Sequence, residues 1–330
     1  MVHFHEHDAK IGHVNKTNFS SNYLFKDGAT NRVHFNNLGF RTESTYTEEE
    51  IAELGRIKIF AVGDSTTVAF EVEGQQTYPS VLQEQLGQDY LVINAGTRGY
   101  DTQQVVIQYM TKLSKLKPDV LIYMICQNDF DQNIDNYLYK DLVSYYGKGY
   151  IDTGDKKLLK FIEPNWDLFQ RIKVLLEGNL RLTYSTLHFI KHTFMEFFYS
   201  LEDDNESSKI NKMEELLSVL DKISGRFGTR VYVAFFPEEE LFSTAQIEFS
   251  AKPAFHRYKE IKNYIQKDLA NTTLIPTYDF FLAQDPKHLR KSPFHFEKDK
   301  HANVAGNHII GSYIAEFLTR NPRATSDGSQ

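Results

Sequence analysis

The sequence lacks the features of several common protein classes. Its single cysteine, Cys126, excludes an intrachain disulfide and a zinc site built from several thiolates. The segment nearest to a membrane span, residues 180–201, is interrupted by five charged or histidine side chains, whereas a span needs roughly 20 apolar residues. Asp and Glu (44) outnumber Lys and Arg (37), and the net charge of −7 disfavours binding to nucleic acid.

The start of the chain is also without the apolar core of a signal peptide. His3, His5 and His7 alternate with other residues, and this spacing would place three imidazoles on one face of a strand, where they could bind a metal. Near a chain end, a frayed and solvated segment is the simpler interpretation. We therefore predict no metal site and no cofactor.

Apolar runs and amphipathic patterns alternate through most of the chain. Nearly continuous apolar character, typical of strands covered on both faces of a parallel sheet, is found at residues 57–62, 90–94, 120–126, 230–236 and 273–276. Apolar residues at helical spacing predict helices over residues 79–86, 102–116, 210–223 and 304–318. The alternation predicts a doubly wound α/β fold with a five-stranded parallel sheet and right-handed crossovers.

The alternation stops between residues 130 and 205, where aromatic residues are frequent. We expect a mostly helical insertion after the third strand, which either packs its own small core or forms a lid over the site. Residues 1–55 would be a lead-in segment that packs on the core, and residues 56–320 a single domain that includes the insertion. Residues 321–330 are polar, and a disordered tail is expected there.

Three short polar segments each follow a predicted strand directly. They are Gly-Asp-Ser at residues 63–65, Asn-Ala-Gly at 94–96 and Gln-Asn-Asp at 127–129. Ligands of parallel α/β sheets bind beyond the carboxyl ends of the strands. The three segments are therefore predicted to meet at one rim of the sheet.

Ser65 is the candidate nucleophile at this rim. A serine hydroxyl reacts only when a base takes its proton, and the imidazole of His301, just before the last predicted helix, is suited to this role. Asp299 lies two residues earlier, so both side chains project to the same side of an extended loop, and the carboxylate can fix the imidazole tautomer. Glu297 is the alternative carboxylate. Asp299 is favoured because its shorter side chain is easier to hold rigid.

A reacting carbonyl also needs donors for its developing oxyanion. The candidates are the backbone amides of Ser65 and Gly96 and the side-chain amide of Asn128, with Asp64 and Asp129 as supporting residues. Gly96 is suitable because the absence of a Cβ lets the backbone approach a substrate closely. Each residue also has a structural interpretation: Ser65 and His301 as helix caps, and Asn128 as a turn residue. Their combination on one rim favours catalysis.

These motifs resemble those of the SGNH (GDSL-type) hydrolase superfamily over roughly residues 12–318. The resemblance implies a three-layer, flavodoxin-like α/β/α sandwich, a triad of Ser65, His301 and Asp299, and oxyanion donors at Ser65, Gly96 and Asn128. Residues 32–41 and 99–104 are similar to segments of bacterial members that act on esters of cell-surface polysaccharides and lipids. The chain departs from the family pattern twice. Cys126 replaces a glycine before Asn128, and one residue instead of two separates Asp299 from His301.

The leading functional hypothesis is a serine ester hydrolase that acts through an acyl-serine intermediate on acetyl or short acyl esters of a carbohydrate or related surface molecule. An O-acyltransferase on the same scaffold, a lipid- or thioester-directed acyl hydrolase, and an inactive binding module are the alternatives. We expect a small-molecule or carbohydrate ester as partner and no nucleic acid. The compartment is left open between the cytoplasm and the soluble part of an exported or anchored bacterial protein.

Overall fold

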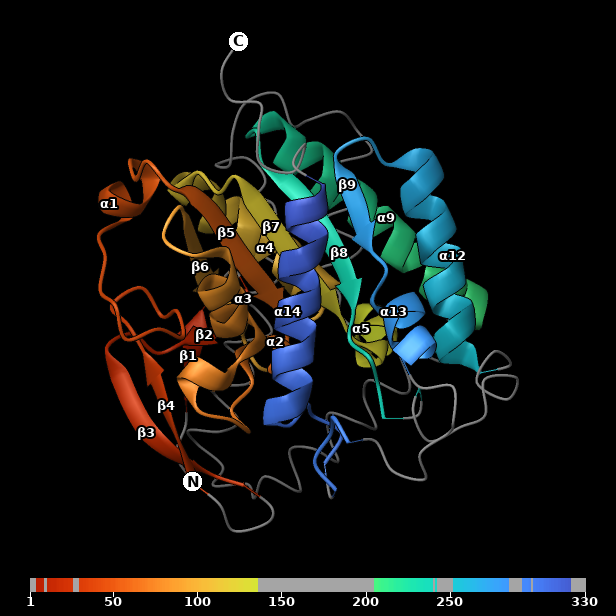
Figure 1. Ribbon diagram of the computed structural model, residues 1–330. Helices are drawn as coiled ribbons and strands as arrows, with labels where there is room; N and C mark the ends of the chain where they lie inside the picture. The colour runs from red at the N-terminus through yellow and green to blue at the C-terminus, as the bar shows by residue number, and fades with distance from the viewer. Residues whose placement is uncertain are drawn as a thin grey trace, which may run out of the picture.

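A five-stranded parallel sheet forms the centre of the molecule (Figure 1). The computed structural model describes residues 4–8, 11–25, 30–135, 205–239, 241, 252–284, 293–297 and 299–321. The strand order is β6-β5-β7-β8-β9, and every neighbouring pair is parallel. The strands are β5 (Ile57–Gly63), β6 (Tyr90–Asn94), β7 (Val120–Ile125), β8 (Arg230–Phe235) and β9 (Thr272–Ile275). Each lies where an apolar run predicts it, so the predicted α/β sheet is confirmed.

Helices cover both faces of the sheet, which completes the predicted three layers. In Figure 1, α3 and α14 lie in front of the sheet, and α4 and α9 lie behind it. The latter two pack on each other, and α12 packs on α9 and on β9. The described helices are α1 (Glu48–Ala52), α2 (Ser65–Val68), α3 (Tyr78–Leu86), α4 (Thr102–Thr111), α5 (Gln127–Asp135), α9 (Glu206–Arg226), α12 (Pro253–Asp268), α13 (Thr277–Gln284) and α14 (Val304–Arg320), with 3-10 turns η1 (Gly74–Gln76) and η2 (Leu113–Leu116).

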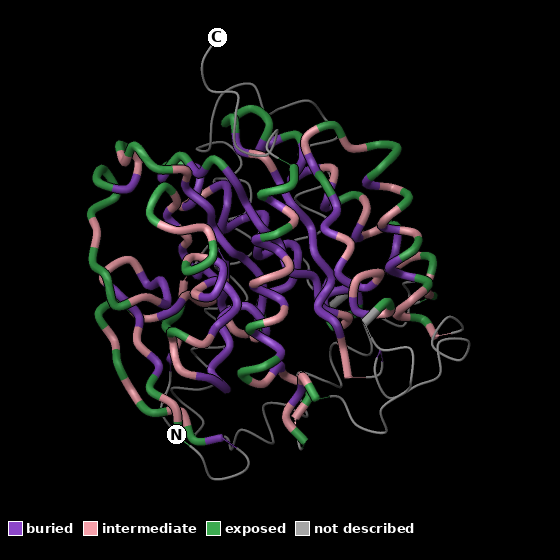
Figure 2. Tube along the Cα trace, viewed as in Figure 1, coloured by how far each residue is buried: buried purple, intermediate pink, exposed green. Residues whose placement is uncertain are grey.

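Burial explains why the strands are nearly continuous apolar runs. All six residues of the central strand β7 are buried, and Figure 2 shows the buried colour concentrated in the sheet. The layer in front is packed closely because Gly311 of α14 lies against α3, where a Cβ would come within 2.6 Å of the Tyr78 carbonyl oxygen. The Tyr78 N–H also donates to Asn307 Oδ1 at 3.0 Å, which joins the first turns of α14 to the start of α3.

The N-terminal residues form two antiparallel hairpins, β1 (His5–Asp8) with β2 (Gly12–Asn15) and β3 (Phe19–Leu24) with β4 (Thr30–Phe35). The prediction of a frayed segment at His3, His5 and His7 is therefore wrong for His5 and His7, which pair with β2, while His3 lies outside the described residues. The reason is packing: an aromatic cluster joins the hairpins to the segment after α2 (Phe4, Val33, Phe35, Val68 and Phe70, with Phe19 and Tyr23 against it).

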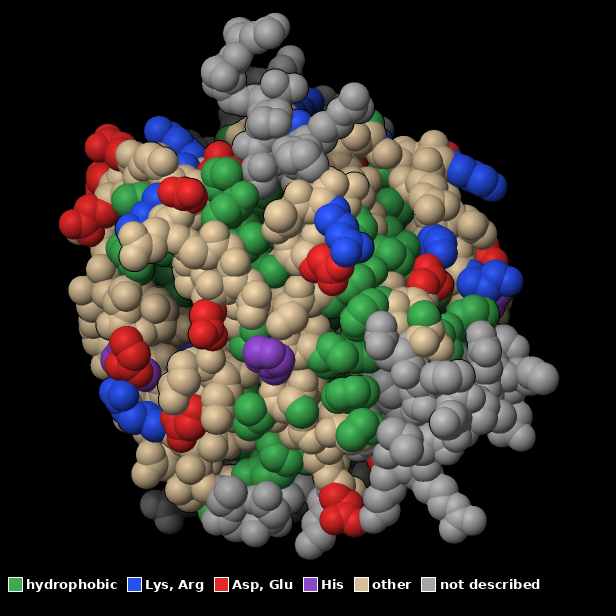
Figure 3. Space-filling view, viewed as in Figure 1, with side chains coloured by type: hydrophobic (Ala, Val, Ile, Leu, Met, Phe, Trp, Pro, Cys, Tyr) green, Lys and Arg blue, Asp and Glu red, His purple; other side chains and the backbone are tan. Residues whose placement is uncertain are grey.

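Some predictions are corrected or lie beyond the described residues. The single helix expected over residues 102–116 divides, because α4 ends at Thr111 and a 3-10 turn follows. The predicted insertion lies outside the described residues apart from 130–135 and 205, and so does the predicted tail from residue 322 onwards. Within the described chain, no helix combines the length and apolar character needed to cross a membrane. Described side chains of both charge signs are interspersed on the face in Figure 3, without a continuous basic patch.

Candidate active site

Ser65 is the first residue of α2, in a turn that begins at the end of β5. Gly63 has φ +145°, and a Cβ there would lie 2.6 Å from Thr67 Oγ1 and 2.9 Å from the Met124 carbonyl oxygen, so this turn requires glycine. Asp64 is the N-cap, and its carboxylate accepts the Thr66 N–H at 2.9 Å. The cap is therefore Asp64 and not Ser65. The Ser65 N–H has no carbonyl partner inside the helix, because it belongs to the first turn.

The short helix α2 is held from its C-terminal side. It has four residues, and its C-cap Ala69 adopts φ +50°, so its dipole is that of a single turn. The buried guanidinium of Arg41 donates to the carbonyls of Val68, Ala69 and Val72. Burial lowers the Arg41 pKa to about 10, although nearby glutamates oppose this shift. Arg41 thus holds the end of the helix that begins at Ser65.

The candidate base reaches Ser65 from the loop before α14. His301 Nε2 lies 2.8 Å from Ser65 Oγ, while His301 Nδ1 contacts Asp299 Oδ1. The same carboxylate oxygen accepts the His301 backbone N–H at 3.0 Å, which fixes the two residues relative to each other. Glu297 is exposed. The structure therefore brings Ser65, His301 and Asp299 together in a continuous chain of contacts.

Hydrogen bonds close the loop that carries His301 into a compact hairpin. His295 and Ala302 form an antiparallel bridge, and the Asn303 side chain donates to the Pro293 and His295 carbonyls. Asn303 Oδ1 also accepts the N–H of Gly306 and so caps α14. The structural interpretation of His301 as this cap is therefore wrong.

Two acceptors compete for the single proton of the Ser65 hydroxyl. His301 Nε2 lies at 2.8 Å, whereas Asp64 Oδ2 lies at 3.4 Å, near the limit of a hydrogen bond. Asp64 also accepts from Thr66 Oγ1 at 2.9 Å and from Asn128 Nδ2 at 3.3 Å. The shorter distance favours His301 as the acceptor. Asp64 organises the turn through its other bonds.

Two of the predicted oxyanion donors, Gly96 and Asn128, lie at this rim and donate hydrogen bonds to protein acceptors. The Gly96 N–H donates to Asn94 Oδ1 at 3.1 Å, and Asn128 Nδ2 donates to Asp64 and to Gln132 Oε1. A Cβ on Gly96 would lie 2.6 Å from the Val68 nitrogen of α2. The absence of a Cβ at Gly96 is therefore required for packing on α2, and the approach of its backbone to a substrate stays a prediction.

Asp129 and Cys126 fix the turn that carries Asn128. Asp129 Oδ2 accepts the Cys126 N–H at 3.0 Å and the Tyr123 hydroxyl at 2.9 Å, and burial, reinforced by the charge of Asp64, raises the Asp129 pKa well above its ordinary value. The Cys126 thiol is buried, as predicted, and lies 3.2 Å from Thr66 Oγ1 and 3.5 Å from Asp64 Oδ1. The cysteine that departs from the family pattern therefore packs beneath Asp64.

Sequence reasoning missed two charged residues beside His301. Glu71 is 3% exposed, and its Oε1 lies 3.8 Å from His301 Nδ1 and 3.5 Å from Arg98 Nη1. Burial raises the Glu71 pKa, while the charges of His301 and Arg98 oppose this shift. Neither residue belongs to a recognisable motif, and only the fold brings Glu71 and Arg98 to the imidazole.

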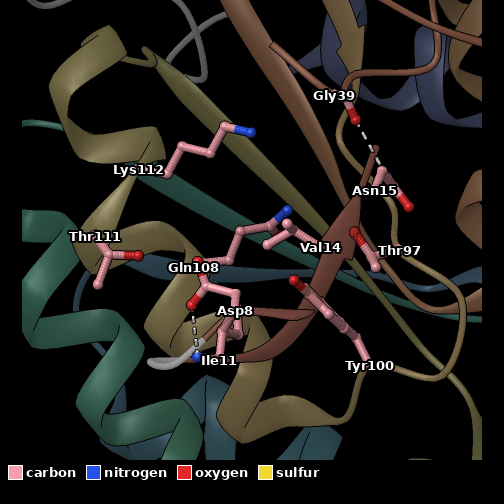
Figure 4. Close-up of a pocket in the computed structure, with 10 residues that line it drawn as sticks. All are labelled: Asp8, Ile11, Val14, Asn15, Gly39, Thr97, Tyr100, Gln108, Thr111 and Lys112. Carbon is pink, nitrogen blue, oxygen red and sulfur yellow. Dashed lines mark hydrogen bonds between the residues drawn. The ribbon is translucent and has the colours of Figure 1, made fainter. Parts of the chain in front are cut away.

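A cavity of about 180 Å³ lies between the first hairpin and α4 (Figure 4). Asn15 lines it and donates to the carbonyls of Gly39 (3.2 Å) and Gly96 (2.9 Å). The amide oxygens of Asn15 and Gln108 are buried there without a hydrogen bond to any described residue. The Asn15 side chain therefore binds the Gly96 backbone from the side of the cavity, and neither Ser65 nor His301 is among the residues that line it.

Several solved structures are similar to this chain at low identity. The esterase EstA from Pseudoalteromonas sp. is 11% identical over 81% of this chain and 99% of its own, with a TM-score of 0.45. The acetyl xylan esterase AlAXEase is 15% identical over 79% and 100%, with a TM-score of 0.45. TesA is 13% identical over 80% and 98%, with a TM-score of 0.44. No curated protein matches the chain.

A sequence model of one family covers most of the chain. It is the model of the GDSL-like lipase/acylhydrolase family, and it matches residues 61–309, which include every site residue predicted above. The N-terminal hairpins precede the matched region. The chain belongs to the GDSL-like lipase/acylhydrolase family.

Proposed function

We propose that this protein is a serine ester hydrolase in which Ser65 is the nucleophile, His301 the general base and Asp299 the residue that orients the base. The observation that carries the proposal is the 2.8 Å distance between His301 Nε2 and Ser65 Oγ, together with the contact of His301 Nδ1 with Asp299. Membership of an acylhydrolase family supports the same class of reaction.

In the acylation step, Ser65 Oγ attacks the carbonyl carbon of the ester while His301 Nε2 takes the hydroxyl proton. Asp299 stabilises the imidazolium that forms and keeps Nδ1 protonated throughout. Collapse of the tetrahedral intermediate breaks the bond to the alcohol, and His301 returns the proton to that leaving oxygen. The products are an acyl-Ser65 ester and a free alcohol.

In the second step, water attacks the acyl-serine carbonyl and His301 again accepts a proton. Collapse releases the carboxylic acid and restores the Ser65 hydroxyl. In both steps, the carbonyl oxygen carries negative charge that needs donors. The Ser65 N–H is the first candidate, and a substrate oxygen would replace Asn94 Oδ1 for the Gly96 N–H and Asp64 Oδ2 for Asn128.

For the substrate, we infer an acetyl or short acyl ester of a carbohydrate or related surface molecule. The inference rests on residues 32–41 and 99–104, which resemble segments of bacterial family members with that chemistry. The structure gives the first segment a role of its own, because Arg41 holds the carbonyls at the end of α2. An O-acyltransferase would use the same triad and would differ in the molecule that accepts the acyl group.

The test is the release of acid from p-nitrophenyl esters of increasing chain length and from an acetylated oligosaccharide. A hydrolase of short esters releases acetate in buffer alone and loses activity as the acyl chain lengthens. If acyl release required an added sugar acceptor, the protein would be assigned as an O-acyltransferase and not as a hydrolase. Failure to turn over any of these esters, with Ser65 accessible to a small reagent, would contradict the proposed function.

A further inference from the structure

A second carboxylate, Glu71, lies beside the candidate base. It follows α2 in the chain, and its side chain is 1% exposed. Neither carboxylate oxygen has a hydrogen bond to another residue that the structure describes, and the Glu71 backbone is the group that acts on it as a donor. A buried carboxylate with so few hydrogen bonds is costly to the folded state, because it has lost its hydration. A residue that served only packing would be better replaced by a neutral or apolar side chain.

The carboxylate is directed at the nitrogen of His301 that does not face Ser65. Glu71 Oε1 is 3.8 Å from His301 Nδ1, the same nitrogen that contacts Asp299 Oδ1. Nδ1 therefore faces two acidic side chains from different parts of the chain. An opposite charge at this distance favours the protonated imidazole, which is the form produced when Ser65 loses its proton.

Arg98 balances the negative charge of Glu71. Its Nη1 is 3.5 Å from Glu71 Oε1 and donates to the Tyr23 hydroxyl at 3.0 Å. The guanidinium also lies over the rings of Tyr23 (5.4 Å) and Phe70 (5.8 Å), so it is confined beside Glu71. The charge of Asp299 also acts on Arg98. The pair of Glu71 and Arg98 therefore forms one electrostatic unit with His301 and Asp299.

Other charged groups also lie around Glu71, and each has partners of its own. The charges of Glu71 and, more weakly, Glu73 act on Arg41, but its guanidinium donates to three backbone carbonyls. Those carbonyls, of Val68, Ala69 and Val72, lie on both sides of Glu71 in the chain and hold its backbone in place. His295 is a further described titratable group that is coupled to His301 by charge.

We propose that Glu71 is a positioning residue for His301, a second carboxylate that stabilises the protonated imidazole through Nδ1, with Arg98 keeping Glu71 charged in its buried position. This inference rests on the proposed function, because it assigns a role around the same base. No bond to the substrate is formed or broken by Glu71. Its contribution is electrostatic, and it acts in both the acylation and the deacylation step.

The test compares Glu71→Gln with Glu73→Gln, a matched change two residues away. Glu71→Gln keeps the size of the side chain and removes the charge. We expect kcat/KM for p-nitrophenyl acetate to fall about tenfold and the acid limb of its pH profile to move to lower pH. At pH 8 the same variant should melt at a higher temperature than the wild type, because burial raises the Glu71 pKa and a neutral amide removes that cost. Glu73→Gln should leave kcat/KM and its pH profile unchanged.

Arg98→Met provides a second test that does not depend on the Glu71 variant. Without the guanidinium, the buried Glu71 carboxyl should keep its proton, so activity should fall to a similar extent. Adding Glu71→Gln to Arg98→Met should then cause little further loss, because the two residues act as a unit. Full additivity of the two losses, or wild-type activity and pH profile in Glu71→Gln, would overturn the inference.

Ser65→Ala, measured in parallel, separates this inference from the proposed function. An inactive Ser65→Ala enzyme with a wild-type-like Glu71→Gln enzyme would contradict the role of Glu71 and leave the hydrolase proposal standing. An active Ser65→Ala enzyme would contradict the proposed function itself.

Discussion

The two sides of the candidate active site are built differently. On the nucleophile side, residues 63–69 are held by satisfied hydrogen bonds: Asp64 caps α2, Asn94 donates to the Thr67 carbonyl at 2.9 Å, and Arg41 occupies the carbonyls at the end of the helix. On the base side, His301 is surrounded by buried titratable groups whose pKa values are shifted, among them Glu71 and His295. Both sides contain buried charge, but that of Arg41 is bound to backbone carbonyls, whereas the Glu71 carboxylate lies beside other charged groups.

The difference between the Ser65 side and the His301 side should affect stability and activity differently. Groups whose polar atoms are satisfied stabilise a fold, whereas buried charge with few hydrogen bonds lowers its stability and is retained where it serves a reaction. Changes on the nucleophile side should therefore reduce stability together with activity. Changes that neutralise the base side should reduce activity while stability is kept or rises.

The largest effect is expected for Asp299→Asn. The amide cannot hold the imidazole in the required tautomer, and in serine triads this change costs about 10⁴-fold in kcat. The melting temperature should change little, so activity and stability should separate as the comparison requires. The measurement is kcat for p-nitrophenyl acetate together with a thermal melt.

The control for Asp299→Asn is Glu297→Gln in the same loop. Glu297 is exposed, and its neutralisation should leave kcat within about twofold, in keeping with the small effect of exposed charges. If Glu297→Gln lost as much activity as Asp299→Asn, the assignment of Asp299 as the carboxylate that supports His301 would be contradicted.

The next effect is a loss of stability in acid that depends on His295. Burial lowers the His295 pKa to about 4, while the Pro237 carbonyl raises it and the charge of His301 lowers it further. In the unfolded chain, the His295 ring takes up a proton at any pH below its ordinary pKa, whereas the folded ring stays neutral. The stabilisation from the neutral ring is therefore complete above the ordinary pKa and is lost as the pH falls toward 4. At roughly 1.4 kcal/mol per pKa unit, the loss is about 3 kcal/mol.

Urea denaturation at pH 7, 5.5 and 4 measures this loss. His295→Gln cannot take up a proton, so its free energy of unfolding should fall by about 3 kcal/mol less than that of the wild type over this range. Opposite contributions from Glu71 and Asp129, whose pKa values are raised, are common to both proteins and cancel in the difference. Parallel curves for the two proteins would contradict the prediction.

The smallest effect is expected for Gly96→Ala on the nucleophile side. The added Cβ would lie 2.6 Å from the Val68 nitrogen and 2.8 Å from Thr67 Cβ, so α2 has to shift. Overpacking of this kind costs about 1–3 kcal/mol, and displacement of Ser65 should lower kcat/KM at the same time. Gly74→Ala is the control, because nothing lies within 4 Å of a Cβ there. Unchanged stability in Gly96→Ala would contradict the claim that changes near Ser65 reduce stability together with activity.

The sequence predicts the parts of the molecule that depend on local patterns. The five apolar runs identify the strands, and because their carboxyl ends share one edge, the approach of Asn128 to the turn of Asp64 and Ser65 could be expected. The approach of His301 to Ser65 across 236 positions could be expected from the chemistry of a serine and an imidazole and from the family motifs, but not from local patterns. The short spacing between Asp299 and His301 is compatible with their contact because the loop is a closed hairpin.

Other parts could not be predicted because tertiary packing decides them. The strand Phe19–Leu24 contains Ser20, Ser21 and Asn22, so it carries little apolar signal, and it forms because aromatic residues beside them pack on Phe70. The helix Pro253–Asp268 is different: its buried Tyr258, Ile261 and Ile265 follow a helical spacing that the sequence contains. Glu71 and Arg98 have no local signal, since their role depends on a loop more than 200 residues away.

The central claim is that Ser65 is a nucleophile activated by His301, and labelling with a fluorophosphonate tests it most directly. The folded wild-type protein should gain the mass of one phosphonyl group, on the peptide that contains Ser65. Ser65→Ala should gain none, and His301→Ala should react far more slowly. An adduct of equal yield in Ser65→Ala, or no adduct on the folded wild-type protein, would contradict the account.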